Sequence, residues 1–181
     1  MEDRALKTLR AMLKERGGEP EIVSNPLDDT KMYTFGKILV IFSLKSRVAE
    51  RDFEHFVEFA SANNFNSGLI IVSPIKPSET VMDVLTAYVA EPSHPFIAMF
   101  ELRHLQFDIS RHRMVPNHKI LEPAQKNEFE KKYKPESLPK IWFHDPMARW
   151  IGAKPGDIVS VNGLCEASGD YQHWRLCVAE I

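Results

Sequence analysis

The chain has 181 residues, of which 44% are apolar and 27% are charged, as in an ordinary folded globular protein. A protein that binds nucleic acid unaided usually has an excess of Lys and Arg, because its affinity rests on contacts to phosphates. The net charge of −2 shows no such excess. No apolar run reaches the roughly 20 residues of a membrane-spanning helix, and the charged start Met1–Arg4 has no apolar leader segment. We therefore expect a protein of the cytosol or nucleus without a membrane partner.

The first part of the chain begins with a predicted helix at residues 4–16. Its apolar stripe is formed by Leu6, Leu9, Met12 and Leu13, and Gly17-Gly18 ends it. A short apolar-polar stretch at 32–35 is followed by an aliphatic strand at 38–42. Ser46 is the predicted N-cap of a second helix, whose apolar side carries Val48, Phe53, Phe56, Val57 and Ala60.

Turn residues at 63–68 then lead into a second aliphatic strand at 69–72. Pro77-Ser78-Glu79 opens a third helix, and a further strand is predicted at 96–100; the apolar face of this helix consists of Val81, Met82, Leu85, Tyr88 and Val89. Uninterrupted aliphatic strands are typical of strands buried on both faces. The pattern therefore predicts an α/β domain at residues 1–103, with a mixed or parallel sheet and flanking helices.

Residues 104–181 have the pattern of a small α+β module. A mixed stretch at 105–110 is broken by Val115-Pro116, and a polar helix is predicted at 123–133. A compact helix follows, with Asp145 as N-cap, Pro146 at its first position and Gly152 just beyond its end. Lys154–Asp157 forms a tight turn, and two strands at 158–161 and 171–179 are joined by a loop that contains Gly163 and Gly169.

A catalytic or metal site is not indicated by any motif. The seven histidines form no ligand pair of helical spacing, and His112 and His118 flank Val115-Pro116, where we favour a turn held by polar side chains. The eight glycines match no phosphate-binding loop, and Cys165 and Cys177 fit neither a zinc site nor a disulfide framework. We expect two reduced thiols, one or both buried, and no cofactor.

One alternative reading is a metal-dependent nuclease built on the first domain. Such enzymes need an acid, then an acid two residues before a lysine on a central strand, to hold Mg²⁺ and polarise the phosphate. Asp28-Asp29 and Lys45 fit two parts of this pattern, but Ser43 stands where the second acid is needed. An active nuclease is therefore disfavoured.

Two further features concern partners. Lys45 and Arg47 lie where a strand passes into a helix, so they are candidate DNA-facing residues, although an ordinary solvated surface is the favoured reading. The module at 104–181 is rich in large apolar side chains, more than a module of this size can easily bury: Trp142, Phe143, Met147, Trp150, Ile151, Tyr171, Trp174 and Leu176. About half must form its core, and the surplus suggests an obligate partner.

The residues of this module resemble a known family. Three runs in order (138–141, 145–152 and 154–159) are similar to Leu-Pro-Arg-Ile, Asp-Pro-Val-Ala-Arg-Tyr-Phe-Gly and Lys/Arg-x-Gly-x-Val-Val. Upstream, His112, Val115, Pro116 and His118 match His-x-x-Val-Pro-x-His. These patterns belong to the fifth-largest, shared subunit of eukaryotic RNA polymerases and its archaeal counterpart. Residues 1–103 resemble the eukaryotic jaw domain only in outline, through Glu15-Arg16-Gly17, 69–73 and Pro77-Ser78.

The resemblance implies a non-catalytic subunit of a DNA-directed RNA polymerase in the nucleus, or in the cytoplasm or virion for a viral version. Its assembly domain at 104–181 would dock on the largest subunit and meet other polymerase subunits, and its jaw domain would lie beside downstream duplex DNA. The docking residues so implied are Pro139, Ile141, Asp145, Pro146, Met147, Arg149, Trp150, Gly152, Gly156 and Tyr171. We expect Arg149 and Trp150 to help hold the docking surface.

The final loop departs from the family pattern Arg-Pro-Ser-Glu-Thr-Ala-Gly-Arg-Tyr. Residues 163–171 keep Glu166, Gly169 and Tyr171 but lack both arginines and the proline. This difference suggests a specialised paralogue that serves one polymerase, or a viral version. A free transcription regulator that binds a polymerase transiently is a further alternative.

Overall fold

The computed structural model describes residues 1–14, 21–22, 29–165 and 169–180. The chain divides into two compact units, Met1–Asp108 (unit 1) and Ile109–Ile181 (unit 2). The division lies a few residues beyond the expected boundary because the short 3₁₀ helix η1 (Leu102–Leu105) follows β5 directly and packs against the first helix of unit 1. Within the described residues, no helix combines the length and apolarity needed to cross a membrane.

Unit 1 is built on a mixed five-stranded sheet with the strand order β1-β2-β3-β4-β5. The strands are β1 (Glu21–Ile22), β2 (Thr30–Phe35), β3 (Ile38–Ser43), β4 (Gly68–Ser73) and β5 (Ile97–Glu101). β1–β2 and β2–β3 are antiparallel, whereas β3–β4 and β4–β5 are parallel. Every residue of β3 and β4 is buried, which confirms the expectation drawn from their aliphatic runs.

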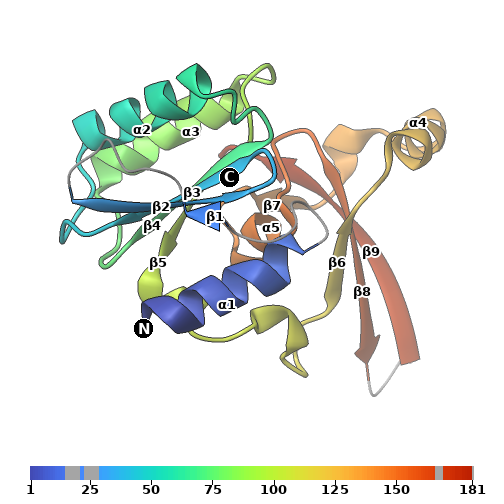
Figure 1. Cartoon of the computed structure of the whole chain (residues 1–181). Coiled ribbons are helices and arrows are strands. Elements are labelled where there is room, and N and C mark those ends of the chain that lie inside the picture. The colour runs from blue at the N-terminus through green and yellow to red at the C-terminus, as the bar shows by residue number, and fades with distance from the viewer. Residues whose placement is uncertain (15–20, 23–28, 166–168, 181) are drawn as a thin grey trace. The chain divides into compact units, whose positions relative to one another are not determined.

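Three helices cover the sheet of unit 1. α2 (Glu50–Ala62) and α3 (Glu79–Ala90) lie on one face and α1 (Glu2–Leu13) on the other, as Figure 1 shows. α2 and α3 are the crossovers β3–α2–β4 and β4–α3–β5, which step across the sheet in the same direction. Crossovers of constant right hand that step in one direction place their helices on the same face. The α/β pattern of unit 1 is thus a mixed sheet with helices on both faces.

The helix boundaries of unit 1 correct two predictions. α1 spans Glu2–Leu13 instead of 4–16, and its buried side consists of Ala5, Thr8, Leu9, Met12 and Leu13, with Leu6 at the margin. Gly17-Gly18, predicted to end this helix, and Glu15-Arg16-Gly17 lie outside the described residues. Ser46 is not the N-cap of α2.

The N-cap of α2 is Ala49, and its backbone N–H donates to Asp52 Oδ2 at 3.0 Å. A carboxylate at the third helical position thus bonds the amide of the N-cap residue, as the corresponding half of a capping box does. Val48 lies just before the helix, not on it, and its relative exposure is 0%. The relative exposure of Phe53, inside the helix, is 2%. These are the two positions of a hydrophobic staple, which sets the angle at which the chain enters a helix. Ser78, by contrast, is the predicted N-cap of α3, and its hydroxyl accepts from Val81 N–H.

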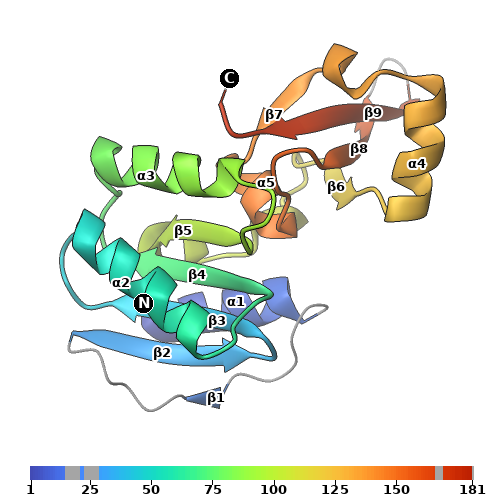
Figure 2. The ribbon, with the colours of Figure 1, turned by 90° about the horizontal axis from the view of Figure 1, so that it is seen from above.

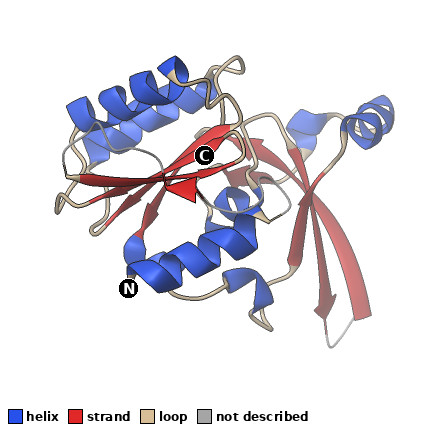
Figure 3. Ribbon diagram, in the orientation of Figure 1, coloured by secondary structure: helices blue, strands red, loops and turns tan. Residues whose placement is uncertain are grey.

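Unit 2 contains a four-stranded mixed sheet with the order β6-β8-β9-β7. Its strands are β6 (Asn117–Ile120), β7 (Lys140–Trp142), β8 (Ile158–Cys165) and β9 (Gly169–Val178). β8 pairs antiparallel with β6 and with β9, and β7 pairs parallel with the last residues of β9. Figure 3, coloured by secondary structure, and Figure 2, seen from above, show the long β8–β9 hairpin at the centre of this unit.

Two α-helices accompany this sheet, α4 (Pro123–Lys132) and α5 (Pro146–Ile151), together with the 3₁₀ turns η2 (Ile109–Arg111) and η3 (Pro135–Ser137). The predicted polar helix, the capped short helix and the two C-terminal strands are all present. Gly163 is not in a loop, however: it lies inside β8, opposite Tyr171 of β9. The hairpin is therefore longer than the sequence pattern indicated.

Candidate partner-docking site

The short helix α5 satisfies its own first backbone groups through one side chain. Asp145 Oδ1 accepts from Met147 N–H at 2.8 Å and from Ala148 N–H at 3.4 Å. The first position of the helix is Pro146, which has no N–H that would need a partner. The N–H groups at the start of α5 that cannot bond within the helix are therefore satisfied by Asp145. Gly152 ends the helix at φ 77°, in the left-handed region, and its N–H donates to Ala148 and Arg149 carbonyls. The predicted caps are confirmed.

The turn after α5 fastens this helix to the sheet. Lys154 N–H donates to Asp157 Oδ2 at 2.8 Å, and Asp157 N–H donates to the Lys154 carbonyl at 3.0 Å. Gly156 adopts φ 92°, which few other residues tolerate, and its N–H reaches the Cys177 carbonyl at 2.9 Å. Cys177 N–H in turn donates to the Asp157 carbonyl at 2.8 Å. The turn therefore connects α5 directly to β9.

The residues proposed to dock on a partner differ in exposure. Ile141, Met147, Arg149 and Trp150 are buried, at 6%, 8%, 6% and 9% relative exposure. Asp145, Gly152 and Tyr171 are half-buried, whereas Pro139, Pro146 and Gly156 are exposed. The buried members contribute to the fold of the chain, and the exposed ones are those that a partner can reach without rearrangement. A docking role for the set stays a prediction.

Tyr171 and Gly163 form a cross-strand pair in the β8–β9 hairpin. A Cβ placed on Gly163 would lie 2.8 Å from Tyr171 Cε1 and closer still to the ring's hydroxyl end, so the ring covers the glycine. The same ring lies 5.0 Å from the ring of His173. An aromatic side chain lying over a strand glycine compensates for the missing side chain. Glu166, Ala167 and Ser168 of the divergent loop lie outside the described residues.

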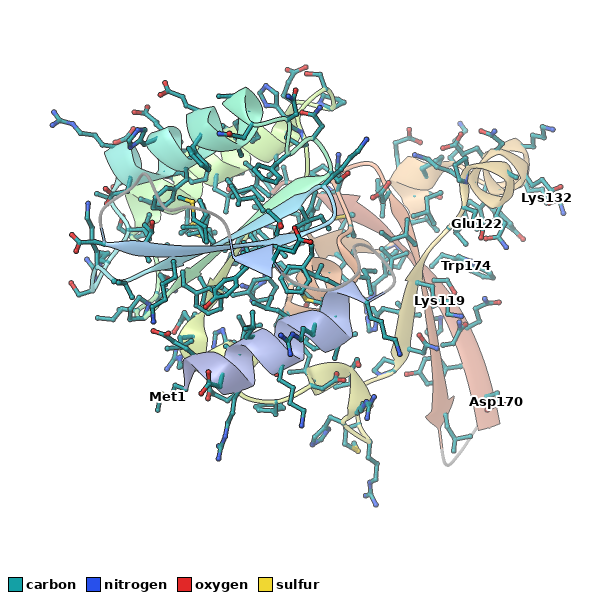
Figure 4. All side chains as sticks on the ribbon, in the orientation of Figure 1. Met1, Lys119, Glu122, Lys132, Asp170 and Trp174 are labelled. Carbon is teal, nitrogen blue, oxygen red and sulfur yellow. The ribbon has the colours of Figure 1, made fainter. Side chains whose placement is uncertain are left out.

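Aromatic side chains gather between α4 and the sheet of unit 2. The ring of Phe129 lies 4.9 Å from that of Tyr133 and 5.6 Å from that of Trp174, and Figure 4 shows Trp174 on the side of the hairpin that α4 approaches. Sequence reasoning classed this helix only as polar. The signal that it overlooked is the pair of aromatics four residues apart, Phe129 in the last turn of the helix and Tyr133 at its C-cap.

The surplus of apolar residues predicted for unit 2 is only partly absorbed by its core. Phe143, Met147 and Trp150 are buried, but Trp142 is 38% exposed and donates from Nε1 to the Ala179 carbonyl at 2.9 Å. Tyr133, at 57%, is also exposed. Such amphipathic rings are common at protein interfaces.

A groove runs along the outer edge of β9. It has a volume of about 390 Å³ and is lined by Leu138 and Pro139 together with residues 172–175 of β9. β7 pairs with β9 only from Leu176 to Val178. Beyond that point, towards Asp170, no strand of the described chain covers this edge.

The candidate DNA-facing residues lie at the end of β3 in unit 1. Lys45 Nζ is bonded to Asp52 Oδ1 at 2.7 Å, and Arg47 is exposed. Partial burial opposes ionisation of Asp52, but hydrogen bonds from Lys45 and from Ala49 N–H, with the lysine charge, outweigh it and lower the pKa of this carboxyl. The side-chain hydrogen bond to Asp52 likewise raises the pKa of Lys45. Lys45 is thus partly neutralised by a neighbour, and DNA contact stays a prediction.

A metal-dependent nuclease site finds no support among the described residues. Ser43, which stands where such a site needs an acid, is buried, and its hydroxyl has no hydrogen-bond partner there. Asp28 lies outside the described residues. Across the described part of the chain, no three His, Cys, Asp or Glu residues are grouped as metal ligands.

His112, His118 and the buried Cys177 lie in local contacts that stabilise the fold. Met114 N–H donates to His112 Nδ1 at 3.3 Å, and His118 Nδ1 lies 2.8 Å from the Pro116 carbonyl, as a polar turn requires. Cys177 is a free thiol with 1% exposure. Burial, with the charges of Asp157 and Asp145, raises the pKa of this thiol to about 12, so it stays protonated near neutral pH.

Comparison with known proteins identifies the C-terminal part of the chain. The family "RNA polymerase Rpb5, C-terminal domain" matches residues 107–177, nearly all of unit 2. "DNA-directed RNA polymerase subunit Rpo5" of Pyrococcus horikoshii is 38% identical over 77 residues, which cover 41% of this chain and 94% of that protein. The Rpo5 subunits of Thermococcus onnurineus and Sulfolobus acidocaldarius are 39% and 43% identical over 77 and 75 residues, covering 94% and 89% of their lengths.

These relatives are matched over almost their whole length, and the matched family covers the capped helix α5, the turn after it and the β8–β9 hairpin described above. The resemblance drawn from the motifs of residues 104–181 is confirmed, and that of residues 1–103 to a jaw domain stays a prediction. The chain belongs to the Rpb5/Rpo5 family of RNA polymerase subunits.

Proposed function

We propose that this chain is a non-catalytic structural subunit of a multisubunit DNA-directed RNA polymerase. The observation that carries this proposal is the match of unit 2 to Rpo5 subunits over 94% of their length. A domain retained at that identity over nearly its full length, with the caps and turns of its signature intact, is expected to keep its assembly partner. The nuclease and the transient regulator are not favoured, since each named relative is a polymerase subunit.

Unit 2 is the assembly domain in this proposal and docks on the largest polymerase subunit. Pro139, Pro146 and the exposed part of Trp142 supply accessible surface, while Arg149 and Trp150 hold α5 in place from within. Unit 1 is the jaw domain and lies beside downstream duplex DNA, with Lys45 and Arg47 nearest the phosphates. The protein then works in the nucleus, or in the cytoplasm or virion if its source is viral.

A tagged pull-down from the native cell at high salt, with mass spectrometry of the partners, tests the assignment. A true subunit stays bound where a polar transient contact is screened away. Recovery of one largest subunit in matching amount indicates a dedicated subunit, in keeping with the divergent 163–171 loop. Recovery of several largest subunits indicates a shared one, and recovery of no polymerase would refute the proposal.

The docking role of α5 is tested in the same assay. Arg149→Ala and Trp150→Ala are each expected to reduce recovery of the largest subunit. Because both side chains are buried, Val159→Ala in β8, also a change at a buried position of unit 2 but outside the proposed docking set, serves as the control for general loss of stability. Unchanged recovery with the two α5 variants would show that these residues play no part in docking.

A further inference from the structure

We propose that the outer edge of β9, from Asp170 to Trp174, receives an extended segment of another polymerase subunit, which joins the sheet of unit 2 as an added strand. The inference rests on the proposed function and specifies how the assembly domain holds its partner. It starts from a sheet edge that the chain leaves open over several residues.

The backbone directions along β9 identify which groups face outward. Leu176 N–H donates to the Pro139 carbonyl and the Val178 carbonyl accepts from Phe143 N–H, so these residues face β7. The N–H of Cys177 donates to the Asp157 carbonyl and its carbonyl accepts from Gly156 N–H, so Cys177 faces the turn that leads into β8. Because the direction alternates along a strand, Asp170, Gln172 and Trp174 also point their N–H and C=O groups outward. Within the described residues, no strand pairs with them.

The chain itself prevents β7 from extending along this edge. Pro139 lies at the position where the next ladder donor to β9 is needed, and proline has no N–H. Before it, Leu138 N–H is bonded to the Pro135 carbonyl inside the η3 turn, so the chain turns away from the edge. Three residues of β9 are left with six outward backbone groups, a row with which an added extended strand can pair.

The side chains around the edge indicate the chemistry of the added segment. Six residues line the groove: Leu138, Pro139, and residues 172–175 of β9, whose side chains alternate between the two faces. Leu138, Pro139 and the half-buried ring of Trp174 suit an apolar side chain. On the opposite face lie the exposed side chains of His173 and Arg175, the latter held beside the edge by a bond from Nη1 to the Lys140 carbonyl at 3.2 Å. A strand with an apolar residue on one side and a carboxylate on the other fits both faces.

The open edge has the length for a short strand. From Asp170 to Trp174 the edge offers five residues, about 13–17 Å at the rise of a β-strand. The segment is therefore expected to be extended, four to six residues long, apolar at alternate positions and acidic opposite Arg175.

Hydrogen–deuterium exchange at single-residue resolution tests the proposal on the full chain, free and within the purified polymerase. The amides of Gln172 and Trp174 are expected to exchange fast in the free chain and at least about tenfold more slowly in the assembled enzyme. The amides of Tyr171 and His173, which face β8, serve as the internal control because they are paired in both states. Equal exchange of the Gln172 and Trp174 amides in both states would overturn the added strand.

A matched pair of variants separates strand pairing from mere coverage. Gln172→Pro removes one outward N–H, whereas Gln172→Ala removes the same side chain and keeps that N–H. We expect Gln172→Pro, and not Gln172→Ala, to lower recovery of the largest subunit at least about tenfold at high salt. Equal recovery of the two would overturn strand pairing even if the amides were protected. Where Gln172→Pro proves unfolded by circular dichroism, the exchange measurement decides alone.

The same experiments distinguish the remaining outcomes. If the free chain forms a dimer in which the Gln172 and Trp174 amides are protected, the occupant is a second copy of this chain and the proposal is wrong. If the chain co-purifies with a polymerase but its edge amides stay unprotected, the added strand fails while the proposed function stands. If no polymerase is recovered, the proposed function itself fails.

Discussion

Replacement of Asp145 by alanine is expected to destabilise unit 2 far more than the loss of one exposed carboxylate normally does. One oxygen of Asp145 serves two amides, those of Met147 and Ala148, at the start of α5. Both residues are buried, at 8% and 0% exposure. Water therefore cannot easily replace the lost acceptor, and α5 is too short to keep its form without its cap.

The size of the effect follows from these contacts. Loss of an N-cap side chain costs about 0.5–2 kcal/mol, and two amides left near the core favour the upper end, about 2 kcal/mol. For a domain of this size, that loss lowers the midpoint of urea unfolding by roughly 1 M. Asp145→Asn keeps an oxygen acceptor and is expected to lose less than half as much.

Tryptophan fluorescence follows the unfolding of unit 2 by itself, because all three tryptophans, Trp142, Trp150 and Trp174, lie in that unit. Asp157→Ala is the comparison, since its carboxylate accepts from the backbone amide of Lys154, outside the first turn of α5. The order of midpoints is expected to be wild type, Asp157→Ala, then Asp145→Ala. A midpoint for Asp145→Ala within about 0.2 M of wild type would show that the double cap does not stabilise the unit.

Three further changes are expected to have measurable effects. Gly152→Ala, at φ 77°, should lower the stability of unit 2 by about 1 kcal/mol in the same fluorescence assay, and Gly152→Asn by less. Asp52→Ala removes the acceptor for the Ala49 amide and should lower the stability of unit 1 by about 1 kcal/mol, followed by far-UV circular dichroism. Because the pKa of Asp52 is lowered in the folded state, this difference should be complete at neutral pH, begin to decrease as the pH falls below the ordinary value of aspartate, and be lost as the pH falls through the lower folded-state pKa. In a Cys165→Ser variant, Cys177 should resist iodoacetamide until the chain is unfolded, because burial raises the pKa of its thiol to about 12; rapid alkylation of the native chain at about pH 8 would contradict that burial.

The sign of the cysteine effect on stability is opposite to that of the aspartate. A folded-state pKa above the unfolded value means that the native thiol keeps its proton while the unfolded one loses it. The stability that depends on Cys177 is therefore complete at neutral pH and decreases as the pH rises above 9.0, the ordinary value, towards 12. Cys177→Ala should reduce that decrease in alkaline urea titrations.

Local sequence signals predicted most elements correctly where the cause is local. Asp145-Pro146 and Gly152 mark the two ends of α5 because a cap and a left-handed residue act on neighbouring backbone groups. The aliphatic runs of β3 and β4 predicted strands buried on both faces for a similarly direct reason. Ser46 was wrong as the N-cap because the helix begins three residues later, after Ala49, whose amide donates to Asp52 inside the helix.

The candidate site was predicted only in part, because exposure and strand pairing depend on residues distant in sequence. The family motifs pointed to Arg149 and Trp150, but the fold buries both side chains. Gly163 was placed in a loop because glycine usually marks one, whereas Tyr171 across the hairpin covers it and keeps it in the strand. The aromatic group of Phe129, Tyr133 and Trp174 needs a helix and a strand to meet.

The sequence by itself determined most of the helices and strands, the caps of α3 and α5, and the family of unit 2, since all of these depend on residue types at short and regular spacing. Only the tertiary structure decided which strands pair. β7 pairs with three residues of β9, and Pro139 stops it there, so the rest of that edge stays open. A local sequence pattern cannot predict that a strand edge stays unpaired, because this depends on which strands of the whole sheet lie beside it.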